Sequence, residues 1–188
     1  MPTAYLGMGA NLPGPLGPPD ATLARAAVEL EGLGRMAARS SLYSTAPVGF
    51  ADQPRFTNAV VALETSLAPL ALLDALLELE RWFGRNRLAT PPKGPRTLDL
   101  DILLLGDITV RERHLEIPHP RLAERAFVLV PLAEIAPRAV EPRSGRTVAE
   151  LLDALAQTHP GELRGVVRMA SALWLPRRGP SNHDSIAP

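Results

Sequence analysis

The sequence lacks several residue types, and each absence removes a class of protein. None of the 188 residues is cysteine, so neither a disulfide nor a thiolate metal site can form. Nineteen of the twenty basic residues are arginine, and the single lysine, Lys93, is followed by Gly94. A phosphate-binding P-loop needs a serine or threonine after its lysine, so this class of nucleotide site is excluded. Aromatic residues make up only 4% of the chain.

Net charge and long apolar runs are also missing. Twenty acidic residues balance the twenty basic ones, so no overall field favours a nucleic acid or a membrane surface. No apolar run approaches the roughly 20 residues that span a bilayer. The N-terminal Met1-Pro2-Thr3 has no basic segment of the kind that opens a secretion signal. We therefore expect a cytoplasmic monomer with neither a nucleic acid nor a membrane as partner.

What is present predicts one α+β domain over residues 1–175, followed by a tail, 176–188, that has little to bury and should be disordered. The order of elements, strand–helix–strand–strand–helix–strand, predicts a ferredoxin-like (split βαβ) core with a mostly antiparallel sheet and helices packed on it. Apolar periodicity and turn residues place strands at 4–9, 35–45, 56–64, 98–105 and 108–113. They place helices at 21–33, with Asp20 as N-cap, and at 69–83, 121–132 and 148–157.

Two carboxylates inside the strand at 98–105 are the most informative feature. Asp99 and Asp101 are two residues apart, so in a strand they lie on one face, about 6.6 Å apart along the backbone. Adjacent negative charges repel one another unless a cation lies between them, and oxygen ligands of this kind suit magnesium with substrate phosphates. The pattern therefore indicates a metal–polyphosphate site. A strand with a solvated acidic face gives the same pattern.

Arginines gather just before the carboxylate pair. Arg81, Arg85, Arg87 and Arg96 fall within sixteen residues. The segment 88–95 between them contains three prolines and a glycine, which indicates a loop. Guanidinium groups beside a metal site can neutralise a polyphosphate, although cations also gather at solvated C-terminal ends of helices.

The chain resembles a known family in the region of the carboxylate pair. The run from Gly94 to Leu103, Gly-Pro-Arg-Thr-Leu-Asp-Leu-Asp-Ile-Leu, matches the signature of 6-hydroxymethyl-7,8-dihydropterin pyrophosphokinases, enzymes of folate biosynthesis. The resemblance extends over roughly residues 4–155, in the family's order and spacing. It is carried also by residues 4–12, 41–49, 52–60, 117–122, 125–129 and 131–137.

The resemblance implies a reaction and its cofactors. Members of the family transfer pyrophosphate from ATP to the 6-hydroxymethyl group of the dihydropterin, giving AMP and the pterin diphosphate. Two magnesium ions, both bound by Asp99 and Asp101, would neutralise the triphosphate of ATP. Arg85 and Arg96 match catalytic positions that stabilise charge during the transfer.

The resemblance also assigns the two substrates to sets of residues. It assigns ATP to Glu80, Arg87, Ile102, His119 and Arg125, and the pterin to Thr45, Val48, Phe56, Asn58 and Phe127. Taken without the resemblance, each of these has a simpler interpretation. A glutamate on a helix can pair with a solvated neighbour, a histidine between two prolines can lie on a surface loop, and phenylalanines usually fill the core.

The chain departs from the family near the signature. Many members have a tryptophan just before Gly-Pro-Arg, where this chain has Pro92-Lys93, so contacts of that loop with the pterin must differ. Two rival functions use the same features. One is a metal-dependent nucleotidyl- or glycosyltransferase with an Asp-x-Asp pair, and the other is a ferredoxin-like RNA-binding module. The second needs exposed aromatic residues on its central strands, and the strand at 98–105 has none.

Overall fold

A six-stranded antiparallel sheet forms the centre of the protein. The computed structural model describes residues 1–47, 52–86 and 94–176. Along the sheet the strands are ordered β10-β3-β4-β1-β5, and β2 pairs with β4 as well. The bounds are β1 Thr3–Ala10, β2 Arg35–Arg39, β3 Leu42–Thr45, β4 Phe56–Glu64, β5 Asp99–Leu105 and β10 Val167–Met169.

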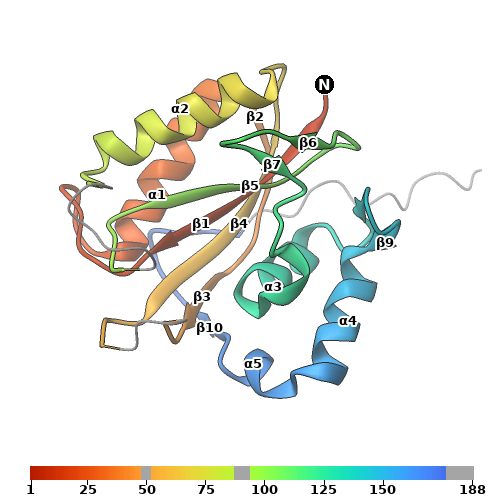
Figure 1. The fold of residues 1–188 in the computed structure, drawn as a ribbon. Coiled ribbons are helices and arrows are strands. Elements are labelled where there is room, and N and C mark those ends of the chain that lie inside the picture. The colour runs from red at the N-terminus through yellow and green to blue at the C-terminus, as the bar shows by residue number, and fades with distance from the viewer. Residues whose placement is uncertain (48–51, 87–93, 177–188) are drawn as a thin grey trace, which may run out of the picture.

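Helices cover both faces of this sheet (Figure 1). Helices α1 (Pro19–Leu30) and α2 (Pro69–Trp82) pack on one face, and α3 (Ala126–Ile135), α4 (Val148–Thr158) and the short α5 (Pro160–Arg164) lie on the other. Two short hairpins complete the structure, β6 (Val110–Arg111) with β7 (Glu116–Ile117), and β8 (Val140–Glu141) with β9 (Arg146–Thr147). No helix within the described residues is long and apolar enough to cross a bilayer.

The connectivity confirms the predicted fold class. Strands β1 and β2 are joined through α1, and β4 lies between them, antiparallel to both. Strand β5, which follows α2, pairs antiparallel with the other side of β1. The order β5-β1-β4-β2 is that of a split βαβ, ferredoxin-like core. Strands β1 and β4 therefore lie at the centre, and eight of the nine residues of β4 are buried.

Two apolar layers hold the helices against the sheet. Leu23 and Leu30 of α1 and Leu72 and Leu76 of α2 pack beside Leu100 of β5 in one layer. Leu129 and Leu132 of α3 pack with Val60 of β4 and with Leu151 and Leu155 of α4 in the other. The two layers account for the apolar spacing of three and four residues on which the helix predictions rest.

Several predicted boundaries were wrong. Residues 35–45 form two strands, because the chain is interrupted at Ser40, whose hydroxyl accepts a hydrogen bond from the backbone N of Val60 at 2.9 Å. Asp20 is not the N-cap: α1 begins at Pro19, since the fixed φ of proline suits the first helical position, and Asp20 lies in the first turn. That helix ends at Leu30 and continues only as the 3₁₀ turn η1 (Glu31–Leu33).

The helix predicted at 121–132 is displaced along the chain. A 3₁₀ turn, η2 (Leu122–Glu124), comes first, and Arg125 is extended with φ −118° and ψ 106°, so α3 begins only at Ala126. Of the strand predicted at 108–113, only Val110 and Arg111 pair, with β7. Strands β7 to β10 and helix α5 were not predicted. The expected disordered tail lies outside the described residues, apart from Pro176.

Candidate active site

Asp99 and Asp101 lie on the same face of β5, as the two-residue spacing predicts. Leu100 and Ile102, between and beyond them, are buried in the apolar layer under α1 and α2. The carboxylates therefore face the side of the sheet that carries α3. On the neighbouring strand β1, Gly9 pairs with Asp99, and Gly7 pairs with Asp101.

The two glycines of β1 leave space beside the carboxylates. Gly9 also pairs with Asn58 of β4, so this glycine lies between an acidic side chain and an amide side chain. A β-carbon on Gly9 would come within 3.1 Å of Asn58 Oδ1, closer than nearly all real contacts. The alternation Gly-x-Gly in a strand is a known mark of close approach by a ligand or another chain, and the sequence interpretation did not use it.

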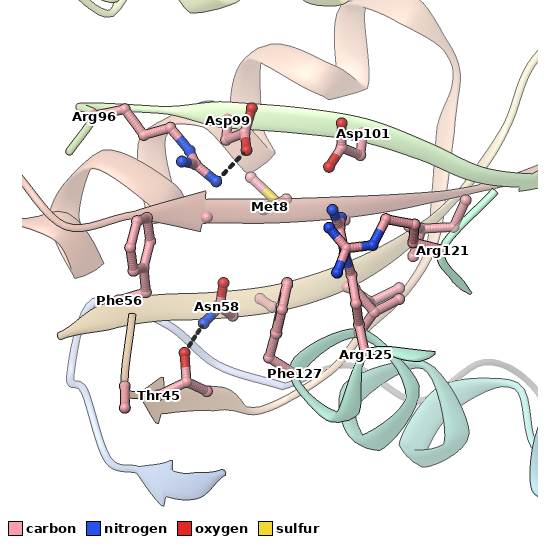
Figure 2. A pocket seen from close by; sticks show the side chains of 17 residues that line it. Met8, Thr45, Phe56, Asn58, Arg96, Asp99, Asp101, Arg121, Arg125 and Phe127 are labelled. Carbon is pink, nitrogen blue, oxygen red and sulfur yellow. Dashed lines mark hydrogen bonds and ion pairs between the residues drawn. The ribbon is translucent and has the colours of Figure 1, made fainter. Parts of the chain in front are cut away.

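A pocket opens over this part of the sheet (Figure 2). Both carboxylates line it on one side, and residues of β3, β4 and the start of α3 line it on the other. Its principal lining residues are Gly7, Gly9, Thr45, Phe56, Asn58, Arg96, Asp99, Asp101, Arg121, Arg125 and Phe127.

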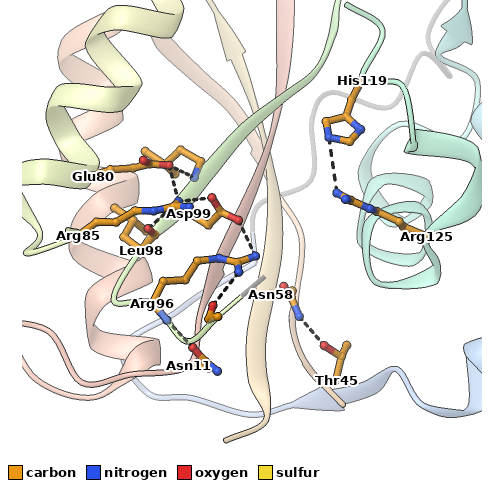
Figure 3. Close-up of polar contacts among 12 residues, drawn as sticks. Asn11, Thr45, Asn58, Glu80, Arg85, Arg96, Leu98, Asp99, His119 and Arg125 are labelled. Atoms are coloured by element: carbon orange, nitrogen blue, oxygen red, sulfur yellow. Dashed lines mark hydrogen bonds and ion pairs between the residues drawn. The ribbon is translucent and has the colours of Figure 1, made fainter. Parts of the chain in front are cut away.

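Asp99 is held by two arginines (Figure 3). Arg85 Nη1 donates to one oxygen of Asp99, and Arg96 Nη2 lies 2.6 Å from the other. Glu80 is 1% exposed, and its carboxylate accepts from Arg85 Nη1 at 2.8 Å and from the backbone N of Leu100 at 2.9 Å. Glu80, on helix α2, therefore fixes the guanidinium of Arg85 and does not line the pocket.

Asn11, at the end of β1, fixes the backbone of Arg96. Asn11 Oδ1 accepts from Arg96 N at 2.8 Å, and Arg96 O accepts from Asn11 N at 3.0 Å. The amide nitrogen of Asn11 donates to Gln53 Oε1 at 3.0 Å and to Pro54 O at 3.1 Å. One buried side chain thus joins the segment before β4 to the segment before β5, and Arg96 of the latter lines the pocket.

Asp101 is in a different environment from Asp99. Within the described ranges no hydrogen bond or ion pair engages its carboxylate. Burial, reinforced by the charge of Asp99, raises the pKa of Asp101 from 3.8 to about 6, against the opposing effect of Arg125 and Arg96. A half-buried carboxylate without a partner, next to a second carboxylate, is a site at which a cation would be stabilising.

His119 positions Arg125 from outside the pocket. The backbone N of His119 donates to Leu103 O of β5 at 2.9 Å, which fixes this loop to the strand of the carboxylates. Its Nδ1 lies 3.1 Å from the backbone N of Arg121, and its Nε2 lies 3.5 Å from Arg125 Nη1. Burial and the charge of Arg125 lower the pKa of His119 to about 4, so at neutral pH the ring is uncharged and can accept hydrogen bonds.

The opposite part of the pocket combines an amide with aromatic rings. Asn58 Nδ2 donates to Thr45 Oγ1 at 2.8 Å, which leaves Asn58 Oδ1 on the side of Gly9. The guanidinium carbon of Arg96 is 4.8 Å from the centre of the Phe56 ring, and that of Arg125 is 5.5 Å from the centre of Phe127. Two arginines that line the pocket thus lie against the aromatic rings that line it.

Most of the predicted site residues come together here. Eight of them line the pocket: Thr45, Phe56, Asn58, Arg96, Asp99, Asp101, Arg125 and Phe127. Arg85, Glu80 and His119 contact these residues from behind. Ile102 is 5% exposed and packs on the opposite face of β5, so an adenine contact by Ile102 stays a prediction. Val48 and Arg87 lie outside the described residues.

The pocket also contains residues that the sequence interpretation did not single out. Gly7 and Gly9 form its floor, Asn11 braces its edge, and Arg121 lines its wall. The Gly-x-Gly alternation could have indicated the floor. No periodic signal distinguishes Arg121 or Asn11, because both depend on contacts between segments far apart in the chain.

The donor atoms around β5 suit a hard divalent cation. Two carboxylates on one strand face, of which Asp101 is half-buried with no partner among the described residues, are ligands of the kind that magnesium binds together with phosphate oxygens. The described residues contain no cluster of three or more histidine, cysteine or acidic side chains that could hold an ion alone. The remaining ligands would therefore have to come from substrate and water.

Comparison with known proteins identifies the family. A family model described as 7,8-dihydro-6-hydroxymethylpterin-pyrophosphokinase matches residues 5–137. Three similar proteins are all named 2-amino-4-hydroxy-6-hydroxymethyldihydropteridine pyrophosphokinase. The Methylorubrum extorquens protein is 43% identical over 88% of this chain and 99% of its own. The Haemophilus influenzae protein is 43% identical over 83% and 94%, and the Synechocystis protein is 49% identical over 61% and 57%.

Solved structures agree with the fold. The wild-type HPPK-DHPS chain of Plasmodium falciparum superposes with a TM-score of 0.69 at 15% identity, and a triple mutant of it superposes with a TM-score of 0.71. Each match covers 95% of this chain but only about half of the Plasmodium chain, 50% and 49%. With the family match over most of its length, and relatives above 40% identity along nearly their whole chains, this protein belongs to the 7,8-dihydro-6-hydroxymethylpterin-pyrophosphokinase family.

Proposed function

We propose that this protein transfers the terminal pyrophosphate of ATP to the 6-hydroxymethyl oxygen of 6-hydroxymethyl-7,8-dihydropterin. The pterin oxygen forms a bond to the β-phosphorus, the bond between that phosphorus and the α,β-bridging oxygen breaks, and AMP leaves. The hydroxyl proton passes to solvent. The observation that carries this proposal is a single pocket in which a carboxylate pair faces an amide and two aromatic rings.

The phosphate side of the pocket is assigned to charged residues. Asp99 and Asp101 would hold two magnesium ions, which would supply positive charge that neutralises the triphosphate during the transfer. Arg96 and Arg125 line the same space and can neutralise phosphate oxygens, with Arg85 and Glu80 fixing Asp99. Phosphoryl transfer depends chiefly on such positioning and neutralisation.

The pterin side is assigned to Asn58, Thr45 and the two phenylalanines. A pterin is flat and carries donors and acceptors along one edge, so it needs apolar faces and fixed polar partners. Asn58 Oδ1 is oriented by the hydrogen bond from its own amide to Thr45, which prepares it as an acceptor. Phe56 and Phe127 line the pocket on either side of Asn58 and can pack against the ring (Figure 2).

The rival transferases predict different products, and a product assay separates them. The protein is incubated with ATP, magnesium and the dihydropterin, and nucleotides and pterins are resolved by chromatography. We expect AMP and pterin diphosphate in equal amounts, no AMP without pterin, and no reaction once a chelator removes the metal. Release of ADP, or of free pyrophosphate with a nucleotidylated product, would contradict the proposal.

The cytoplasmic location and the monomeric state remain predictions from the sequence. Sedimentation of the purified protein at several concentrations tests the second. We expect a single species of about the mass of one chain, 20.2 kDa.

A further inference from the structure

Arg121 is a third arginine that lines the pocket. Neither the family signature nor the residues assigned to ATP and the pterin include it. Arg121 lies in the loop between β7 and η2, four residues before Arg125, and both side chains line the same pocket. Figure 2 shows the two guanidinium groups on the wall across from the strand that carries Asp99 and Asp101. The positive charge of Arg121 is among the causes that lower the pKa of Arg125, which places the two cations close to each other.

The backbone of Arg121 is fixed in this position. Its N–H donates to His119 Nδ1 at 3.1 Å, and its carbonyl oxygen accepts from the backbone N of Glu124 at 3.3 Å in the 3₁₀ turn. His119 is in turn bonded to Leu103 O of β5. The loop is therefore anchored to the same strand as the carboxylate pair, and a ligand bound at Asp99 and Asp101 meets Arg121 at a defined place.

The side chain of Arg121 is only weakly held. Its Nε lies 3.2 Å from Glu124 Oε2, and the two side chains are 40% and 64% exposed. Exposed pairs of this kind contribute little to stability, because solvent screens them and two long side chains must be ordered. The remaining donors of the guanidinium fork are thus available to an anion, and two neighbouring like charges are stabilised when an anion lies between them.

We propose that Arg121 and Arg125 together bind the diphosphate group that is transferred, from the wall of the pocket that faces the carboxylate pair. This inference rests on the proposed function and adds Arg121 to the residues that grip the substrate. The group held is the β,γ-diphosphate of ATP before transfer and the diphosphate of the pterin product afterwards. AMP, which contains neither of these phosphates, does not contact Arg121.

Calorimetric titration with inorganic pyrophosphate and with AMP, each with magnesium, tests the inference without any turnover. For Arg121→Ala we expect pyrophosphate affinity to fall about tenfold or more, since a charge-assisted hydrogen bond is lost, while AMP affinity changes less than about twofold. The matched control is Arg138→Ala, because Arg138 is an exposed arginine outside the residues that line the pocket. It should leave both affinities unchanged.

Two further variants separate binding from structure. Arg121→Lys keeps the positive charge but loses the bidentate guanidinium group. It should therefore bind pyrophosphate more tightly than Arg121→Ala but less tightly than the wild type. Glu124→Gln removes the partner of Arg121 and should leave pyrophosphate affinity unchanged or higher. The inference is overturned if Arg121→Ala binds pyrophosphate as tightly as the wild type, or if Glu124→Gln loses as much affinity as Arg121→Ala.

The outcome is independent of the product assay. If the wild type forms AMP and pterin diphosphate while Arg121→Ala retains full pyrophosphate affinity, the role of Arg121 fails and the proposed function stands. If pyrophosphate binding depends on Arg121 but no pterin is turned over, the diphosphate site stands and the proposed acceptor is wrong.

Discussion

The two carboxylates of β5 share a strand face but not an environment. Asp99 is neutralised by Arg85 and Arg96, whereas Asp101 is half-buried and has no such partner among the described residues. The shared face followed from the two-residue period of a strand, and this part of the site was predictable from sequence alone. The buried Glu80 beside Arg85 was not, because its role depends on the contact of α2 with the backbone of Leu100 in β5, which only the fold brings about.

The carboxylate of Asp101 is half-buried and has no partner among the described residues. We therefore expect this carboxylate to be needed for activity and to lower the stability of the metal-free protein. In Asp101→Asn we expect turnover to fall by a hundredfold or more, since a metal ligand is lost, while the metal-free protein becomes more stable by about 1–2 kcal/mol. Denaturant unfolding with a chelator present, together with the product assay, measures both effects. A variant that is less stable and still active would contradict this account of Asp101.

His119 predicts a dependence of stability on pH. Its pKa in the folded protein is about 4, below the ordinary 6.5, so protonation favours the unfolded chain. The stability contributed by the neutral ring is complete above pH 6.5 and is lost as the pH falls towards 4, by about 3 kcal/mol. Urea unfolding between pH 7 and 4 should show this loss in the wild type and a smaller one in His119→Gln. Parallel curves for both proteins would refute it.

At the scale of elements, strand β1 serves as the floor of the pocket. The strands at 4–9, 56–64 and 98–105 and the helix at 69–83 were predicted closely, because each has a strong period and a clear stop. The displaced start of α3 and the divided strand at 35–45 were missed, because local tertiary bonds decide both: the extended Arg125 and the hydroxyl of Ser40. Short strands such as β7 and β10 are defined by their pairing with β6 and β3, which a local sequence pattern does not reveal.

Because β1 forms the floor of the pocket, a methyl group added at Gly9 should weaken pterin binding. In Gly9→Ala the new carbon would lie 3.1 Å from Asn58 Oδ1, so it would displace the amide that we propose as a pterin contact. We expect the KM for the pterin to rise about tenfold or more, with a smaller effect on the KM for ATP. Gly32→Ala is the control, because nothing lies within 4 Å of its added carbon. Equal pterin KM values in the two variants would contradict the assignment of the floor.

At the scale of the whole molecule, the segment after residue 137, where the family match ends, closes one side of the sheet. Strand β10 pairs with β3, and the buried Trp174 donates from Nε1 to Ser40 O at 2.7 Å. Strand β10 and Trp174 are not among the residues that line the pocket, so their contribution should be to stability and not to chemistry.

The two tryptophans of the chain test this division. Trp174 is 3% exposed and Trp82 is 56% exposed. Trp174→Ala should lower the free energy of unfolding by about 3–5 kcal/mol, the usual loss for a buried aromatic residue. Trp82→Ala should lower it by less than about 1 kcal/mol. Folded Trp174→Ala, assayed at low temperature, should retain the wild-type ratio of the two KM values, and a selective loss of either substrate would contradict the structural role.

We propose that Asp99 and Asp101 hold the divalent cations that bind the triphosphate of ATP beside the pterin. The most direct measurement is a crystal structure of the protein with manganese, a non-hydrolysable ATP analogue and the dihydropterin, in which anomalous scattering locates the metal. We expect metal between both carboxylates and the nucleotide phosphates, with the pterin beside Asn58. Metal or phosphate bound elsewhere, with the two carboxylates not coordinated, would contradict it.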